Sequence, residues 1–148
     1  MGENGHQVGQ TLQQLLTTAK TDGKIKSDNL TTMSPTEAEM VKYVRNCFLS
    51  VKVAFFNELY DACHHHKCNY DNVRLAASVD TRIGTGHTLV PGPDGHRGFG
   101  GHCFPKDVAA WCTFNTKTHS IVDAARKRNL EIDRPEKDWE QDKGRAVV

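Results

Sequence analysis

The sequence has little net charge, and it contains no long hydrophobic run. Its formal charge is +1 over 148 residues, so charge gives no general signal for nucleic-acid binding. No stretch of about 18 or more apolar residues could span a bilayer, and the N-terminal MGENGHQVGQ lacks the basic and then apolar pattern of a signal peptide. We therefore expect a cytoplasmic globular protein of modest size that binds neither nucleic acid nor membrane.

The cysteines lack the even number and the regular spacing of a disulfide framework, so reduced thiols are expected. There are 5 of them: Cys47, Cys63, Cys68, Cys103 and Cys112. The spacing of Cys63-His-His-His-Lys-Cys68 could suit zinc, but no second ligand cluster follows at a finger-like distance. Polar and cationic residues are also favoured at a helix C-terminus, so we expect no metal site.

A phosphate-binding glycine fingerprint is absent as well. Neither G-x-G-x-x-G between a strand and a helix nor G-x-x-x-x-G-K-[ST] occurs. Residues 84–101 nevertheless hold more than half of the 12 glycines, together with Pro91 and Pro93, and this composition predicts a long loop. Such loops inside a compact domain are usually functional or disordered, and this one leads directly to Cys103.

Two helices are predicted in the N-terminal half. Apolar residues at helical spacing indicate a helix over Val8–Ala19, and residues 24–33 after it form either a short strand or a loop. The run Ser34-Pro-Thr-Glu37 is then a capping-box signal for a helix start. No proline or glycine interrupts residues 36–66, which predicts a single helix roughly 45 Å long.

This long helix carries an apolar stripe that one small domain cannot cover by itself, so we expect a homodimer through residues 36–66. The stripe consists of Val41, Val44, Phe48, Val51, Phe55, Leu59 and Ala62, widened by Met40, Tyr43, Cys47 and Ala54. Lys42 and Asn46 are four residues apart on the same helix and share a face. From spacing alone, they form either a solvated polar edge or part of a functional site.

Two shorter helices are predicted further along the chain. Tyr70–Val79 is an amphipathic segment, and Pro105 can occupy the first turn of a helix that continues through Lys106–Phe114. Cys103 would then lie just before a helix N-terminus, where the partial positive charge and Lys106 favour thiolate over thiol. The alternative is a turn that carries a buried structural cysteine.

Four blocks of sequence, in this order, resemble the central domain of the UDP-glucose/GDP-mannose dehydrogenase family. They are Glu37-Ala-Glu-Met-Val-Lys42-Tyr-Val-Arg-Asn46-Cys-Phe-Leu, Lys52-Val-Ala-Phe-Phe-Asn-Glu58, Asp80-Thr-Arg82-Ile-Gly and Gly98-Phe-Gly-Gly-His-Cys103-Phe-Pro-Lys-Asp107. The resemblance implies a mainly α fold, with a helical central and dimerisation domain over residues 34–148 built on one long helix. Residues 1–33 would be a linker, or else the end of a preceding dinucleotide-binding domain in the form of a remnant αβ unit.

The resemblance also implies an activity. Members of the family oxidise the primary alcohol of a nucleotide sugar, UDP-glucose in the simplest case, to a carboxylate in two NAD-dependent hydride transfers. Cys103 would be the nucleophile that forms a thiohemiacetal and then a thioester. Lys42 and Asn46 would stabilise the oxyanion and order the water, and Asp107 would assist proton transfer and hydrolysis.

Further residues would bind the ligands, again as the resemblance implies. Lys106 would lie near the NAD cofactor, and Arg82 would reach the substrate site of the neighbouring subunit. Phe99, Gly100 and Gly101 belong to the loop that lets the sugar and the nicotinamide approach the cysteine.

The sequence departs from the family pattern in two places. The segment between Arg82 and Cys103 is longer than in many members, which leaves the sugar and base contacts there unassigned. The glycine fingerprint of the dinucleotide-binding domain is missing, so we expect the chain to be inactive without a separately encoded NAD-binding domain. An isolated domain, one half of a split gene product and a remnant kept as a non-catalytic dimerisation or assembly module all stay open.

Overall fold

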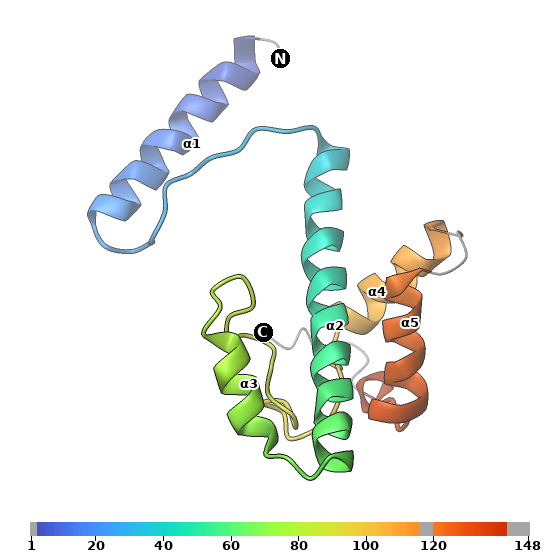
Figure 1. Cartoon of the computed structure of the whole chain (residues 1–148). Helices are drawn as coiled ribbons and strands as arrows, with labels where there is room; N and C mark the ends of the chain where they lie inside the picture. The colour runs from blue at the N-terminus through green and yellow to red at the C-terminus, as the bar shows by residue number, and fades with distance from the viewer. Residues whose placement is uncertain (1–2, 116–119, 142–148) are drawn as a thin grey trace. The chain divides into compact units, whose positions relative to one another are not determined.

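The computed structural model describes residues 3–115 and 120–141, and it is built from helices (Figure 1). They are α1 (Glu3–Thr21), α2 (Pro35–His65), α3 (Tyr70–Ser78), α4 (Cys103–Phe114) and α5 (Ile121–Arg128), then a π-helical turn, η1 (Asn129–Asp133), and a short 3₁₀ helix, η2 (Asp138–Glu140). No β-strand occurs in the two described ranges, which confirms the mainly α fold class. None of these helices combines the length and the apolar character needed to cross a membrane.

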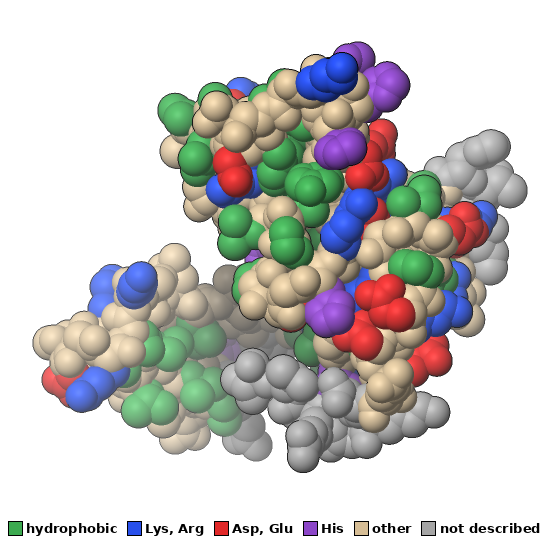
Figure 2. Space-filling view, turned by 90° about the horizontal axis from the view of Figure 1, so that it is seen from below, with side chains coloured by type: hydrophobic (Ala, Val, Ile, Leu, Met, Phe, Trp, Pro, Cys, Tyr) green, Lys and Arg blue, Asp and Glu red, His purple; other side chains and the backbone are tan. Residues whose placement is uncertain are grey.

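The chain divides into two compact units, residues 1–39 and residues 40–148, and the boundary falls inside α2. In the first unit, α1 begins earlier than predicted and is followed by a loop that folds back onto it. Gln13 Nε2 donates a hydrogen bond to the Asp28 carbonyl (2.9 Å), and Lys20 pairs with the Asp28 carboxylate (2.6 Å). Hydrophobic side chains gather on part of the surface of α1 (Figure 2).

Residues 24–33 form no strand, so the αβ unit expected at the N-terminus is represented by its helix alone. The apolar alternation of this segment is weak, and a strand needs a neighbouring strand to satisfy its backbone, which the described residues do not supply. The assignment of residues 1–33 to the end of a preceding domain stays a prediction.

Helix α2 begins as the sequence predicts. The Ser34 N–H donates to Glu37 Oε2 (2.7 Å), and the Glu37 N–H donates to Ser34 Oγ (3.3 Å), so the two residues form a reciprocal capping box. Pro35 occupies the first helical position, where its missing N–H costs nothing. These local signals place the helix start within one residue of its predicted position.

In the second unit, α3 lies on one side of α2, and α4 and α5 lie on the other (Figure 1). Two groups of buried apolar side chains hold these elements together. The first group is Cys47, Phe99, Val108 and Val122. The second group, at the C-terminal end of α2, is Phe56, Cys63 and Tyr70.

The predicted apolar stripe of α2 is divided between the core and the surface. Cys47 and Ala54 are buried, whereas Val44, Phe48 and Phe55 keep 56%, 64% and 58% of their surface exposed. The apolar positions therefore cover more than one face of the helix, and a single copy of the chain buries only part of them.

The glycine-rich loop between α3 and α4 is held by side chains of the helices around it. Lys52 on α2 donates to the Ile83 carbonyl (2.6 Å), and the Tyr70 hydroxyl on α3 donates to the Thr88 carbonyl (2.6 Å). Thr88 is fully buried. The loop thus has a defined path from α3 to the start of α4.

Helix α5 and the turn η1 are elements that the sequence did not predict. Ser120 caps α5, because its Oγ accepts a hydrogen bond from the Asp123 N–H (3.3 Å). Only Val122 and Ala125 of the helix are buried. An amphipathic pattern of 8 residues is too short to stand out from sequence periodicity alone.

Candidate active site

Asp107 is the centre of a polar cluster that joins α4 to α2. Its side chain is fully buried, and its carboxylate accepts hydrogen bonds from Lys42 Nζ (3.3 Å), Asn46 Nδ2 (2.5 Å) and Lys106 Nζ. Because Lys42 and Asn46 are one turn apart on α2, both can reach the same carboxylate. These two residues therefore belong to a polar cluster with Asp107, and their part in a functional site stays a prediction.

Burial and hydrogen bonding act on Asp107 in opposite directions. Burial is the largest single influence and would raise the pKa of this carboxyl, but the bonds from Lys106, Asn46 and Lys42 together outweigh it and hold the pKa below its ordinary value. The bond to Asp107 likewise raises the pKa of Lys106. The ammonium groups of the two lysines stay accessible, since their side chains are 54% (Lys42) and 64% (Lys106) exposed.

Cys103 is the first residue of α4, so the helix starts two residues before Pro105, the predicted position. The cysteine is exposed and does not belong to the core. It precedes Asp107 by four residues, which puts the two side chains on the same face of α4, one turn apart. The arrangement combines an accessible thiol with a fixed carboxylate, a lysine and an amide.

Asn129, at the start of η1, holds the backbone of Phe99 from both sides. Its Oδ1 accepts a hydrogen bond from the Phe99 N–H (2.7 Å), and its Nδ2 donates to the Phe99 carbonyl (2.9 Å). The preceding Gly98 has a φ of +66°, and a Cβ there would lie 2.2 Å from Asn129 Oδ1. Glycine is thus required at this position both by conformation and by space.

The next two glycines have different requirements. A Cβ on Gly100 would lie 2.5 Å from Cζ of Arg134, which is itself buried and paired with Asp94 (2.6 Å) and Asp138 (2.5 Å). Gly101 has a φ of +69° but free space around it, so its requirement is conformational. The loop is therefore packed closely against charged side chains on one side.

An open cavity of about 620 Å³ adjoins this loop, within the size range of small-molecule sites. Phe99 and Gly100, two of the predicted substrate-binding residues, line it. So do His87, Asp94 and Phe104, the residue that follows Cys103. Cys103 itself and Gly101 do not line the cavity.

Arg82, also predicted to bind substrate, does not line this cavity. Its guanidinium pairs with Asp80 (2.6 Å), and its side chain is 88% exposed. It borders a separate apolar groove of about 530 Å³ that Phe48 and Phe55 of α2 also line. Arg82 is thus adjacent to the exposed surface that the predicted dimer would use.

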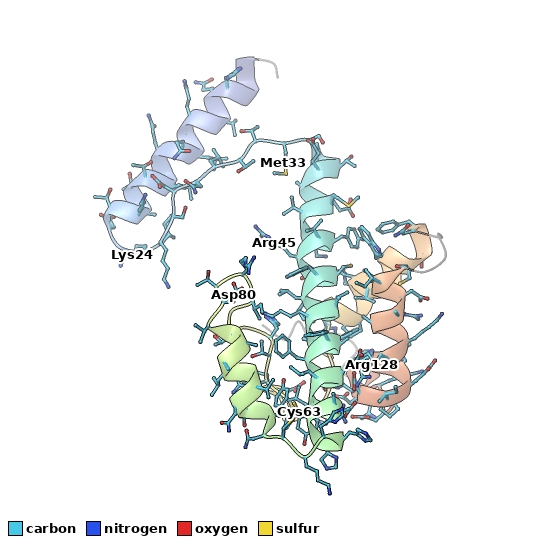
Figure 3. All side chains as sticks on the ribbon, in the orientation of Figure 1. Lys24, Met33, Arg45, Cys63, Asp80 and Arg128 are labelled. Carbon is cyan, nitrogen blue, oxygen red and sulfur yellow. The ribbon has the colours of Figure 1, made fainter. Side chains whose placement is uncertain are left out.

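The sequence did not reveal the ion pairs and hydrogen bonds that join the glycine-rich loop, at Arg97, to the helices around it. Arg97 pairs with Asp61 (2.8 Å) and Asp133 (2.9 Å), and Arg128 pairs with the same two carboxylates (2.5 and 3.0 Å). Figure 3 labels Arg128 on α5. Asn57 accepts a further bond from Arg97 Nε (3.3 Å). Asn57 had a sequence signal, because it lies in one of the four blocks that resemble the family.

Among the described residues, one group of three potential metal ligands lies close together: His96, Glu136 and Asp138. Both carboxylate oxygens of Asp138 already accept hydrogen bonds from Arg134. We assign no metal to this group.

The comparisons with known proteins agree with the resemblance read from the motifs. The model of the UDP-glucose/GDP-mannose dehydrogenase family, central domain, matches residues 36–131. A UDP-glucose 6-dehydrogenase of Rickettsia bellii is 44% identical over 97 residues, which are 64% of this chain and 21% of that protein. One from Pseudomonas aeruginosa is 36% identical over 110 residues, 74% of this chain and 22% of that protein. One from Rhizobium meliloti is 41% identical over 73 residues, 49% of this chain and 16% of that protein.

The chain spans about a fifth of the length of the curated relatives it matches. The residues matched by the family model include most of α2, the glycine-rich loop and α4, which together carry the Asp107 cluster and Cys103. The match extends over more than half of the chain. The chain belongs to the UDP-glucose/GDP-mannose dehydrogenase family and carries its central domain.

Proposed function

We propose that this chain is the catalytic and dimerisation part of a nucleotide-sugar dehydrogenase. The enzyme oxidises the C6 alcohol of a UDP-sugar to a carboxylate, and UDP-glucose is the substrate that we propose. The observation that carries the proposal is the exposed Cys103, one helical turn from a buried carboxylate that fixes a lysine and an amide of α2. A nucleophile, a cation and an amide donor are the groups that covalent oxidation of an aldehyde needs. A cytoplasmic location, expected from the sequence, fits this function.

Cys103 acts as the nucleophile in this proposal. Its sulfur adds to the carbonyl carbon of the C6 aldehyde, and the carbonyl oxygen takes up the negative charge of the thiohemiacetal. Lys42 and Asn46, held by Asp107, donate hydrogen bonds to this oxygen. After oxidation to the thioester, water displaces the sulfur, so that the carboxylate product and the free thiol are released.

Asp107 has two roles in the same scheme. Its lowered pKa keeps the carboxylate charged at neutral pH, so that it holds Lys42 and Asn46 in place throughout the reaction. As an anion it can also accept a proton from the attacking water. Lys106, with its largely exposed ammonium, is the residue that would face the cofactor.

NAD supplies the two-electron acceptor for both oxidations, as the family resemblance implies. The sequence contains no G-x-G-x-x-G, and the described residues contain no strand that leads into a helix N-terminus. We therefore propose that a separate domain binds NAD and that the chain alone is inactive.

The proposal includes a homodimer through α2. Val44, Phe48 and Phe55 are exposed, and burial of each large apolar side chain contributes about 1.5–3 kcal/mol. Obligate interfaces typically bury over ~2,000 Å², an area that a long helix and its flanks can provide. In such a dimer Arg82, at the border of the groove, would approach the site of the partner subunit.

A second candidate function is a non-catalytic dimerisation or assembly module. The exposed apolar residues of α2 favour it, because they serve an interface without any contribution from Cys103. The catalytic function requires an accessible and reactive Cys103 thiol, whereas the assembly module requires only the long helix.

Cysteine alkylation tests the choice. We expect UDP-glucose to slow the alkylation of Cys103 by iodoacetamide several-fold, because a sugar whose C6 group reaches the thiol blocks the reagent, whereas ADP-glucose should protect less. Cys68, which is exposed and has no role in the proposed reaction, is the internal control and should label at the same rate throughout. Equal labelling of Cys103 with and without UDP-glucose would favour the assembly module.

A further inference from the structure

The turn between α2 and α3 brings two cysteines together. The Cys68 N–H donates to the Cys63 carbonyl (2.9 Å), the Lys67 N–H donates to the His64 carbonyl (3.2 Å), and Lys67 has a φ of +55°. These features define a Schellman motif, which is frequently accompanied by a contact between the side chains at the Cys63 and Cys68 positions. Figure 3 labels Cys63 at this end of α2.

The two thiols differ in accessibility. Cys63 is only 3% exposed and packs with Phe56 and Tyr70, whereas Cys68 is exposed. The Cys68 thiol donates to the Cys63 carbonyl oxygen (3.5 Å). Burial, and then contact with Cys68, raises the pKa of Cys63. An external reagent therefore meets Cys68 first, and the buried Cys63 is the residue to which the Cys68 thiol is hydrogen-bonded.

We propose that Cys63 and Cys68 are a site of reversible oxidation, which forms an intramolecular disulfide by exchange with a small-molecule disulfide such as oxidised glutathione. The turn that ties the exposed Cys68 to the buried Cys63 carries the proposal, because both the N–H and the thiol of Cys68 are hydrogen-bonded to the Cys63 carbonyl. Lys67, next to Cys68, adds a positive charge that favours the approach of an anionic disulfide. Neither cysteine takes part in the proposed oxidation of the sugar, so the two proposals are independent.

The exchange takes two steps, and its atoms and electrons balance. The thiolate of Cys68 attacks one sulfur of oxidised glutathione, which forms a mixed disulfide and releases one glutathione thiolate. Cys63, after loss of its proton to solvent, attacks the Cys68 sulfur and releases the second glutathione. The two protein thiols are oxidised to one disulfide, and one molecule of oxidised glutathione is reduced to two thiols.

The new bond would tie the end of α2 to the beginning of α3. Asn69, the next residue, caps α3 by accepting a hydrogen bond from the Asn72 N–H (2.9 Å). Tyr70 follows and bonds to Thr88 in the glycine-rich loop (2.6 Å). The disulfide would therefore stabilise the turn between α2 and α3, and Tyr70, which follows this turn, holds the glycine-rich loop.

Peptide mapping tests the proposal on the chain itself. The folded protein is equilibrated with mixtures of oxidised and reduced glutathione, quenched by alkylation and cleaved with trypsin. Because trypsin cuts after Lys67, the disulfide would join peptides 53–67 and 68–74, and this linked pair is identified by mass. We expect the folded chain to reach half-formation at a glutathione oxidation ratio at least about tenfold lower than the urea-unfolded chain, because the fold pre-orients the thiols.

Three variants complete the test. Cys63→Ser should stop at the mixed disulfide on Cys68, Cys68→Ser should leave Cys63 as a thiol that is labelled only after unfolding, and Cys47→Ser should form the linked peptides like the wild type. Since Cys68 is exposed, its replacement should not disturb the fold. Equal oxidation ratios for the folded and unfolded chain, or a folded wild type that stops at the mixed disulfide, would overturn the proposal.

Discussion

At the scale of single residues, Asp107 fixes the geometry of the candidate site. It is fully buried, and donors from two helices surround its carboxylate. Asp107→Asn keeps the shape but removes the charge and turns an N–H₂ group toward other donors. We expect this variant to lower the free energy of unfolding by about 2–4 kcal/mol in urea denaturation. Exposed Glu131→Gln, the matched control, should change it by less than about 0.5 kcal/mol.

The pH dependence of stability follows from the lowered pKa of Asp107. A carboxyl with a lower pKa in the folded state stabilises the protein above its unfolded pKa of about 3.9, and this contribution is lost as the pH falls through the folded value. The difference between the wild type and Asp107→Asn should thus stay constant from about pH 7 to about pH 5 and shrink below about pH 3.9. A difference that is unchanged in acid would show that charge is not its cause.

Lys42 should influence the reactivity of Cys103. Lys42→Met keeps the length of the side chain but removes the cation that is bound to Asp107. Asp107 lies one helical turn from Cys103 on α4. We expect slower alkylation of Cys103 near neutral pH, measured by mass spectrometry, with the protein still folded. The control is Lys24→Met, which removes an exposed lysine from the first unit. Equal rates of Cys103 alkylation in the two variants would show that Lys42 does not act on the thiol.

At the scale of secondary structure, the turn η1 determines the position of the glycine-rich loop. Asn129→Ala removes both hydrogen bonds to the Phe99 backbone and leaves a buried N–H and C=O without these partners. We expect a loss of about 2–4 kcal/mol in stability and faster proteolysis within residues 84–101. Asn72→Ala, on the exposed side of α3, should change neither. If the loop is cleaved no faster in the Asn129 variant, η1 does not hold it.

The exposed face of α2 makes its own prediction. Phe48→Lys and Phe55→Lys place charges in the middle of the proposed interface, and we expect either to convert a dimer into a monomer in sedimentation experiments. Leu75→Lys, at an exposed apolar residue of α3 that does not line the groove of Phe48 and Phe55, should leave the dimer intact. A wild type that sediments as a monomer at high micromolar concentration would refute the interface.

The helices differ in how well sequence could predict them, for physical reasons. Helix α2 has a capping box and a long uninterrupted run, and α3 has an amphipathic pattern, so both were predicted to within about a residue. The Asn69 cap of α3 was not identified from the sequence. Helix α4 starts earlier than expected, because Cys103 and Phe104 join its first turn. Helix α5 is too short for periodicity, and a π-helical turn such as η1 has no sequence signal of its own.

At the scale of the whole molecule, the sequence motifs indicated the residues of the Asp107 cluster but not the residues that hold the glycine-rich loop. The resemblance singled out Lys42, Asn46 and Asp107, and the structure brings their side chains together; their catalytic roles stay predictions. The partners of the loop, Asn57 and Asn129, are separated from it by 41 and 30 residues. Contacts over such separations depend on how helices pack, which no local pattern in one sequence records.

The central claim is that Cys103 carries out the oxidation of a UDP-sugar when NAD is bound by a separate domain. The direct measurement is NADH formation after the chain is mixed with UDP-glucose, NAD and a separately produced domain that binds NAD. We predict two molecules of NADH for each UDP-glucose consumed, because conversion of an alcohol to a carboxylate is a four-electron oxidation. Cys103→Ser should produce none, although its fold and oligomeric state match the wild type. Absence of NADH with the wild type in a mixture where the two domains associate, or undiminished NADH with Cys103→Ser, would contradict the claim.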